Sequence, residues 1–173
     1  MEENPILFQR KTKKRSVILI LAIGSFASLF LNVLFSLLHF TESSKVYGQV
    51  AANQFSLSLV WGILLYGIIS PITEEIVFRG LVYNRLRRTF SLPISLIASS
   101  LLFGIYHGNI VQALYGFLLG LLIAWIYEKY GSFLMPVLIH SAANITLYIV
   151  MSNQYLKHIV ITPIFCLLMA QLN

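Results

Sequence analysis

The stretch FSLSLVWGILLYGIISPITEEIVFRGLVYNRLRR, residues 55–88, indicates more about the fold than any other part of the chain. Residues 55–72 carry no charged side chain and are long enough to cross a bilayer core, which takes about 20 helical residues. Two glutamates follow at once, and residues 73–88 continue in a helical pattern with a basic end. Thr73 is expected to cap this second helix. Pro71 leaves open whether the two helices are continuous through a kink or separate.

The composition of the whole chain points to lipid as the solvent around most of the protein. Of its 173 residues, 58% are hydrophobic and only 10% are charged, whereas soluble domains carry roughly 25% charged residues. So few charges cannot cover a water-soluble globule of this size. Further apolar segments occupy residues 16–40, 92–106, 111–127, 133–151 and 158–172.

These segments predict an all-α fold, namely a polytopic transmembrane helical bundle of about six to seven helices. Residues 1–15 are expected to be a basic tail, and residues 16–173 a single transmembrane domain. Within that domain the residues with chemical interest lie between about 60 and 150. Residues 41–54 are polar and are expected to connect two spans.

The net charge of +6 is concentrated at a few places in the chain. Five of the twelve basic residues lie in the block 10–15, directly before an apolar segment. That position is typical of a cytoplasmic anchor beside anionic lipid headgroups, and it predicts a multi-pass protein of the cell membrane with a cytoplasmic N-terminus. Arg85, Arg87, Arg88 and Lys129 are expected on the same side. A nucleic-acid partner is not expected, because no basic face or groove-reading module follows.

Ionisable side chains inside the apolar segments are the best guide to function. Placing a charge at the bilayer centre costs roughly 2.5–3.5 kcal/mol, so such groups tend to be paired, buried in the bundle and functional. This criterion selects Glu74, Glu75, Arg79, His107 and His140, together with the polar Asn144.

The two glutamates are expected to differ in role. Glu75 and Arg79 are spaced i, i+4, which is the favoured order for a helical ion pair and neutralises Glu75. Glu74 points about 100° away from Glu75 and lacks a local countercharge. A carboxylate of that kind in a low-dielectric pocket suits a general base or acid. The alternative is that both acids only favour a helix N-terminus.

His107, His140 and Asn144 complete a set of groups that is typical of hydrolysis. A carboxylate and His107 can hold and deprotonate a water molecule. His140 and Asn144 share one helix face and can donate hydrogen bonds to an oxyanion. Taken one by one, His107 could be an interfacial histidine and the other two an interhelical hydrogen-bonding pair. Taken together, the groups need no serine or cysteine nucleophile.

A metal centre is the competing mechanism. Glu74, His107 and His140 all carry groups that zinc binds. However, the compact HExxH arrangement is absent from the sequence, and the three side chains come from three segments. We therefore expect no metal and no cofactor, with a zinc-dependent reaction as the alternative.

Three short motifs resemble those of the CAAX-protease and bacteriocin-processing (CPBP, Abi) family of membrane proteins. They are TEEIVFRG at 73–80, similar to EExxxR, FGIYH at 103–107, similar to FxxxH, and HSAAN at 140–144, similar to HxxxN. Each motif alone is loose, but three in this order inside apolar segments are quite specific. The resemblance covers about residues 60–150, and elsewhere the match is only in hydrophobicity.

The resemblance implies an all-helical intramembrane glutamic endopeptidase acting on a membrane-associated peptide or protein. By that analogy Glu74 and His107 activate water, His140 and Asn144 form the oxyanion hole, and the ion pair of the first motif supports the site. Eukaryotic members cleave prenylated C-termini, and small bacterial members are often linked to bacteriocin maturation or self-immunity. Nothing in this sequence selects among those substrates.

Two other functions are compatible with the same residues. One is a non-catalytic membrane immunity or interaction protein, in which the motif residues are structural. The other is a small transporter or channel subunit with an intramembrane proton relay, although that would need polar residues along both halves of the membrane. A shape-preserving Glu74→Gln change distinguishes catalysis from sequestration, because only catalysis needs the carboxylate.

Overall fold

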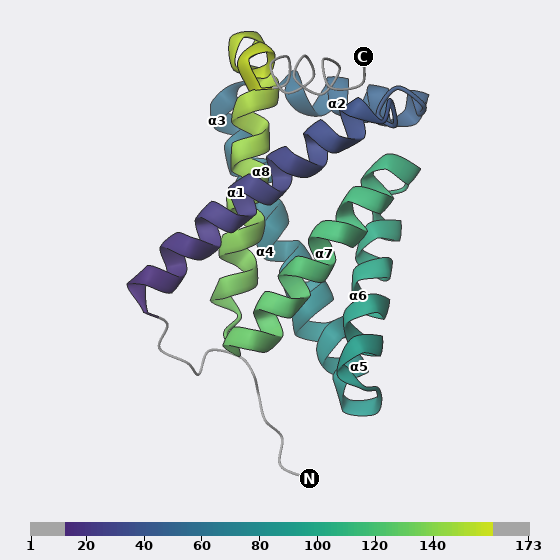
Figure 1. The fold of residues 1–173 in the computed structure, drawn as a ribbon, viewed down its shortest axis with the longest axis vertical. Helices are drawn as coiled ribbons and strands as arrows, with labels where there is room; N and C mark the ends of the chain where they lie inside the picture. The colour runs from purple at the N-terminus through teal and green to yellow at the C-terminus, as the bar shows by residue number, and fades with distance from the viewer. Residues whose placement is uncertain (1–12, 161–173) are drawn as a thin grey trace, which may run out of the picture.

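A computed structural model of the protein describes residues 13–160, and all regular structure within them is helical, which confirms the predicted all-α membrane bundle (Figure 1). The expected segment at 158–172 lies outside the described residues beyond position 160, as does the basic tail up to position 12. The helices are α1 (Lys14–Leu37), α2 (Lys45–Phe55), α3 (Leu59–Gly62), η1 (Ile63–Ile69), α4 (Ser70–Glu75), η2 (Ile76–Tyr83), α5 (Asn84–Thr89), α6 (Leu92–Tyr106), α7 (Ile110–Tyr130) and α8 (Leu134–Ser152).

The elements from α3 to α5 form one long helix, Leu59–Thr89, in which η1 and η2 are π-helical turns. Pro71 lies inside this helix, so the two predicted segments are continuous. The expectation that Thr73 caps a new helix is wrong, because its hydroxyl donates to the carbonyls of Ile69 and Ser70 at 3.1 and 2.9 Å. Such internal bonds keep backbone carbonyls satisfied in a segment that water does not reach.

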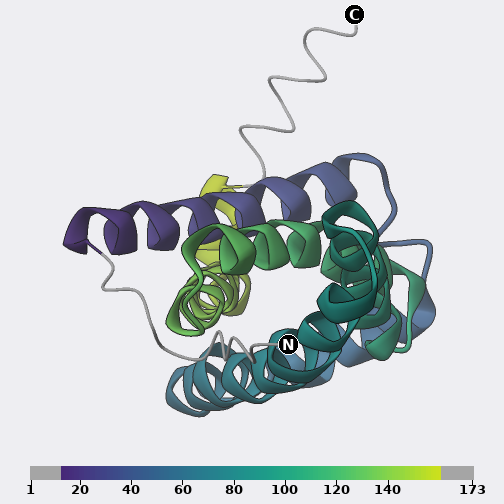
Figure 2. The same cartoon turned by 90° about the horizontal axis from the view of Figure 1, so that it is seen from below.

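Four helices of the described part are long and apolar enough to cross a membrane. They are α1, the long helix, α7 and α8, while α6 is apolar but shorter, with 15 residues. Figure 2 shows α1 and the long helix on opposite sides of the bundle, with α8 between them. The protein is therefore a polytopic helical bundle, as the apolar segments predict.

Glycines allow several helices to approach closely, and two of them face a backbone carbonyl of a neighbouring helix. A Cβ atom on Gly24 of α1 would lie 2.4 Å from the carbonyl oxygen of Ile139 in α8. On Gly104 of α6 it would lie 2.3 Å from the carbonyl oxygen of Ala113 in α7. Because membrane helices attract one another mainly by packing, such contacts hold α1 on α8 and α6 on α7.

The polar segment after α1 contains more structure than the sequence predicts. Residues 45–55 form α2, and the hydroxyl of Ser44 caps it by accepting from the backbone N–H of Tyr47 at 3.2 Å. No residue of α2 is fully buried, but Tyr47, Ala51, Gln54 and Phe55 are half-buried and recur at helical spacing on one face. The helix lies at the upper end of the bundle in Figure 1.

The beginning of α1, the whole of α5 and the end of α7 lie toward the lower end of Figure 1, opposite α2. Among the described residues, the basic side chains expected on one side lie in or next to these elements: Lys13, Lys14, Arg15, Arg85, Arg87, Arg88 and Lys129. Arg87 of α5 pairs with Glu128 of α7 at 3.0 Å. The excess of positive charge predicts that this end is cytoplasmic.

Cysteine labelling in sealed, oriented membranes tests that topology. In a Cys166→Ser background, Lys13→Cys and Arg87→Cys are expected to react with a membrane-impermeant maleimide from the same, cytoplasmic face. Lys45→Cys of α2 should react from the other face. Labelling of positions 13 and 87 from opposite faces would contradict the arrangement.

Candidate active site

The ion pair expected within the first motif is present in the middle of the bundle. Arg79 donates from Nη1 to Oε1 of Glu75 at 2.9 Å, and both side chains are fully buried. The guanidinium also donates from Nη2 to the carbonyl of Gly120 in α7 at 2.9 Å. Its carbon lies 4.9 Å from the ring centre of Phe103 in α6. Arg79 thus links the long helix to both neighbouring helices.

His140 of α8 lies between the two glutamates. Its Nδ1 is 2.7 Å from Oε1 of Glu75, and its Nε2 is 3.6 Å from Oε2 of Glu74. A carboxylate only accepts hydrogen bonds, so we assign the Nδ1 proton to His140. The distance to Glu74 is too long for a direct hydrogen bond. Glu75 therefore orients the imidazole, and Nε2 faces the other carboxylate.

Glu74 differs from Glu75 in being open to a cavity. Its side chain retains 12% of its exposure, against 0% for Glu75. One carboxylate oxygen accepts a hydrogen bond from the hydroxyl of Ser70, one turn earlier in the same helix. Both Glu74 and Ser70 line the cavity. The two glutamates therefore differ in their surroundings, as their expected roles require. Glu75 is enclosed by Arg79 and His140, whereas Glu74 faces the cavity.

His107 follows α6 and lines the same cavity. Its Nδ1 is 3.0 Å from the carbonyl oxygen of Phe103, so we assign the proton of the neutral ring to Nδ1 and a lone pair to Nε2. The Phe103 ring meets the rings of His107 and His140 edge-on, with centroids 5.1 and 5.5 Å apart. The phenylalanine of the second motif therefore positions both histidines.

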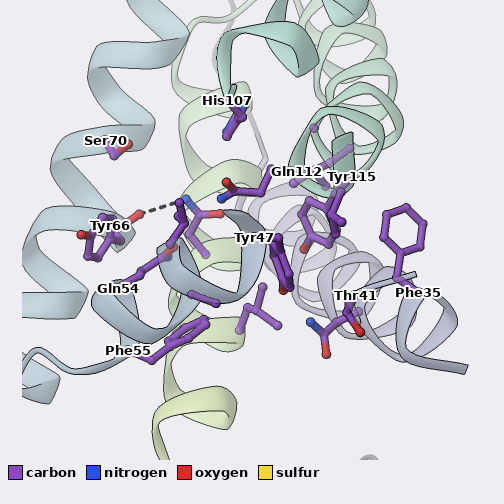
Figure 3. Close-up of a pocket in the computed structure, with 18 of the residues that line it drawn as sticks. Phe35, Thr41, Tyr47, Gln54, Phe55, Tyr66, Ser70, His107, Gln112 and Tyr115 are labelled. Atoms are coloured by element: carbon purple, nitrogen blue, oxygen red, sulfur yellow. Dashed lines mark hydrogen bonds between the residues drawn. The ribbon is translucent and has the colours of Figure 1, made fainter. Parts of the chain in front are cut away.

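Asn144 lies one turn after His140 in α8 and is tied to the long helix. Its Nδ2 donates to the carbonyl of Tyr66 in η1 at 2.9 Å, the bond drawn as a dashed line in Figure 3. One of its two amide hydrogens remains for another acceptor. Asn144 also lines the cavity, together with His140.

The cavity that these side chains share has a volume of about 250 Å³ and extends from Glu74 to α2 (Figure 3). Four predicted site residues line it, while Glu75 and Arg79 lie behind them. Several further polar residues line the cavity without belonging to any sequence motif, and uncharged hydroxyl, phenol and amide groups gave no signal that distinguishes them from other polar residues of the chain. These further residues are Asn32, Thr41, Tyr47, Gln54, Tyr66, Ser70, Gln112 and Tyr115.

The arrangement suits hydrolysis. A carboxylate and the lone pair of His107 Nε2 face one cavity, and His140 and Asn144 line it from a neighbouring helix. Within residues 13–160, no group of three or more His, Cys, Asp or Glu side chains has the geometry to hold a metal ion.

The fold and these motifs define a class of protein, a polytopic membrane protein with its ionisable side chains gathered in the bundle. The sequence model of the family described as type II CAAX prenyl endopeptidase Rce1-like matches residues 55–146, more than half of the chain. The protein belongs to this family, as the resemblance predicts. The matched residues include all three motifs.

Two curated proteins are similar over part of the chain. The UPF0177 protein YxdF of Lactococcus lactis subsp. lactis (strain IL1403) is 29% identical over 82 residues, 47% of this chain and 45% of that protein. The protein named "Putative membrane peptidase YdiL" of Bacillus subtilis (strain 168) is 28% identical over 82 residues, 47% of this chain and 34% of that protein. The match therefore spans less than half of either relative. No solved structure matches the chain.

Proposed function

We propose that this protein is a CAAX-type intramembrane peptidase that hydrolyses a peptide bond in a membrane-associated peptide or protein, with Glu74 as the general base. One observation carries the proposal. Glu74, His107, His140 and Asn144 come from three segments, yet they line one cavity inside the bundle. Polar groups are tolerated in apolar segments when they satisfy one another or face water, and here they do both.

The proposed reaction begins with a water molecule held between Glu74 and Nε2 of His107. Glu74 takes one proton as the water oxygen attacks the substrate carbonyl, which forms a C–O bond and a tetrahedral oxyanion. In this proposal His140 carries a proton on both ring nitrogens: Nδ1–H donates to Glu75, and Nε2–H joins the free amide hydrogen of Asn144 in stabilising that oxyanion. When it collapses, the C–N bond breaks and Glu74 passes the proton to the leaving nitrogen. The products are a carboxylic acid and an amine, and neither cofactor nor metal takes part.

Glu75 and Arg79 act in this proposal through other groups. The Glu75 carboxylate accepts from Nδ1–H of His140, so Nε2 is the ring nitrogen left to face the reacting atoms. Arg79 donates to Glu75 and holds it against α7 through the carbonyl of Gly120. Both are positioning residues, because neither lines the cavity.

The proposal is tested with purified protein in lipid nanodiscs, incubated with membrane-associated peptides and followed by mass spectrometry. Cleavage at an internal bond is expected, and strong chelators should leave the rate unchanged. Activity that chelators remove and zinc restores would establish a metalloprotease instead. A folded protein that cleaves no peptide, and that leaves the membrane peptide profile of its own cells unchanged, would favour a non-catalytic immunity or interaction protein.

Replacing Asn144 by alanine is expected to lower kcat by about 10²–10³, because one oxyanion donor is lost. Some activity should remain, since His140 still donates. Ser152→Ala is the control on the same helix, because that hydroxyl is exposed and bonds only to its own backbone. Thermal unfolding of both variants separates a catalytic effect from loss of the Asn144 bond to Tyr66. Unchanged kcat in a folded Asn144→Ala protein would remove this residue from the oxyanion hole.

A further inference from the structure

The cavity extends well beyond the cluster of Glu74 and the histidines, and this outer part has a different chemical character. Among the described residues that line the cavity, acidic and imidazole groups occur only at its inner end, and lysine and arginine do not occur. The outer wall consists of apolar side chains, such as Val50, Phe55 and Val111, and of neutral hydrogen-bonding groups, namely carboxamides, phenols and one alcohol. The hydrogen-bonding residues are Asn32, Thr41, Tyr47, Gln54, Tyr66, Gln112 and Tyr115.

The cavity opens toward α2 and is closed on the opposite side. On the side of α5, the side chains beyond the glutamates are packed, and Arg79, Tyr83 and Tyr127 are 1%, 0% and 0% exposed. On the side of α2, the lining residue Val50 is 38% exposed. A peptide reaching the cluster therefore passes the neutral wall first.

Gln112 and Tyr47 are the wall residues best placed to contact such a peptide. Figure 3 shows Gln112 between His107 and α2, and Tyr47 lines the same cavity from α2. The Gln112 carboxamide oxygen accepts from the side chain of Asn109, which caps α7, so its NH2 group remains available as a donor. Burial raises the pKa of the Tyr47 phenol, so this group is neutral at physiological pH.

A wall of this kind discriminates by charge. Amides and phenols can bind peptide N–H and C=O groups and neutral polar side chains. A lysine or glutamate side chain held there would be desolvated without a countercharge, which is costly. A terminal carboxylate would also lack a cation to receive it.

We propose that the space between the Glu74 cluster and α2 is a substrate subsite that binds an uncharged, hydrogen-bonding segment of the peptide beside the scissile bond, with Gln112 determining specificity. This inference rests on the proposed function, because only a peptidase would cleave the bound peptide. The selectivity of peptide binding can nevertheless be measured without turnover. It assigns a role to residues outside the three motifs.

Binding is measured on the Glu74→Gln protein in nanodiscs, so that no peptide is consumed. The probes are seven-residue alanine peptides blocked at both ends, with a single guest glutamine, lysine or glutamate moved through each position. At one or more positions, glutamine is expected to bind about 10²-fold more tightly than either charged guest, as unpaired charges are rejected. Equal affinity for all three guests at every position would overturn the proposal.

A charge introduced into the wall should then reverse the selectivity. Adding Gln112→Glu is expected to shift the lysine-to-glutamine affinity ratio by at least about 10-fold toward lysine. Gln49→Glu is the matched control, since Gln49 is exposed on α2 and does not line the cavity. Gln112→Leu, which stays neutral, should weaken glutamine binding and still reject lysine.

These outcomes separate the two proposals. Selective binding without cleavage by the wild-type protein would refute the peptidase and leave a peptide-binding site. Cleavage by the wild type with a ratio that Gln112→Glu does not change would refute the subsite and leave the peptidase. If the Gln112→Glu protein does not fold, Gln112→Leu is used instead. Unchanged binding of the glutamine peptide to Gln112→Leu would also refute the subsite.

Discussion

Replacing Glu74 by glutamine is expected to abolish turnover while leaving the bundle and peptide binding largely intact. The amide has the shape of the carboxylate, and its oxygen can still accept the hydroxyl of Ser70. It cannot accept a proton from water, and general-base catalysis contributes typically about 10²–10⁴ in rate. Because no second carboxylate lines the cavity among the described residues, we expect the loss to reach the limit of detection.

The measurement is kcat with a cleavable peptide, alongside Kd for the same peptide and the midpoint of thermal unfolding. Glu42→Gln is the control for removing one negative charge, because the Glu42 side chain is 73% exposed and lies outside the cavity. It should retain wild-type activity. Full activity in Glu74→Gln would end the glutamate mechanism, and loss of peptide binding together with turnover would indicate a structural role.

Replacing Arg79 by alanine is expected to destabilise the protein by about 3–5 kcal/mol, because it removes the permanent countercharge of the buried Glu75 carboxylate. Glu75 is 0% exposed, and Arg79 donates to it at 2.9 Å. The variant also loses the bond to the Gly120 carbonyl and the contact with Phe103. Its yield and unfolding temperature in a mild detergent should fall along with activity.

Arg87→Ala is the matched control for this experiment. Arg87 also pairs with a glutamate at 3.0 Å, but the side chains of the pair are 31% and 27% exposed. Exposed pairs contribute roughly 0–1 kcal/mol, so the unfolding temperature should change little. If Arg79→Ala were as stable as Arg87→Ala, the buried Glu75–Arg79 pair would not contribute the expected amount of about 3–5 kcal/mol to the free energy of unfolding.

Local sequence patterns determined the class of the protein and the existence of most of its elements. Apolar length alone predicted α1, α6, α7 and α8 to within a few residues, because the hydrocarbon thickness of a bilayer sets the length of each span. The spacing of Glu75 and Arg79 predicted their ion pair, since i and i+4 side chains meet on any α-helix. The limits of the domain and the catalytic roles of the site residues stay predictions.

Where local signals conflicted, the sequence was a poorer guide. Pro71 and Thr73 suggested a helix boundary, but the long helix continues through both. Membrane helices tolerate such residues because side chains and neighbouring helices satisfy the freed backbone groups. The helix α2 was missed because the polar composition of residues 41–54 indicated a connection, although Tyr47, Ala51 and Phe55 recur at helical spacing on one face.

Only the tertiary structure decided which polar groups meet. The contact of His140 with Glu75 joins residues 65 positions apart, and the bond of Asn144 to Tyr66 joins residues 78 apart. The periodicity of apolar residues indicates which face of one helix is buried, but it does not predict how two helices cross. The crossings depend on close contacts such as that of Gly24 with Ile139. They turn three separate motifs into one cavity, and they bring Gln112 and Tyr47, which belong to no motif, into its wall.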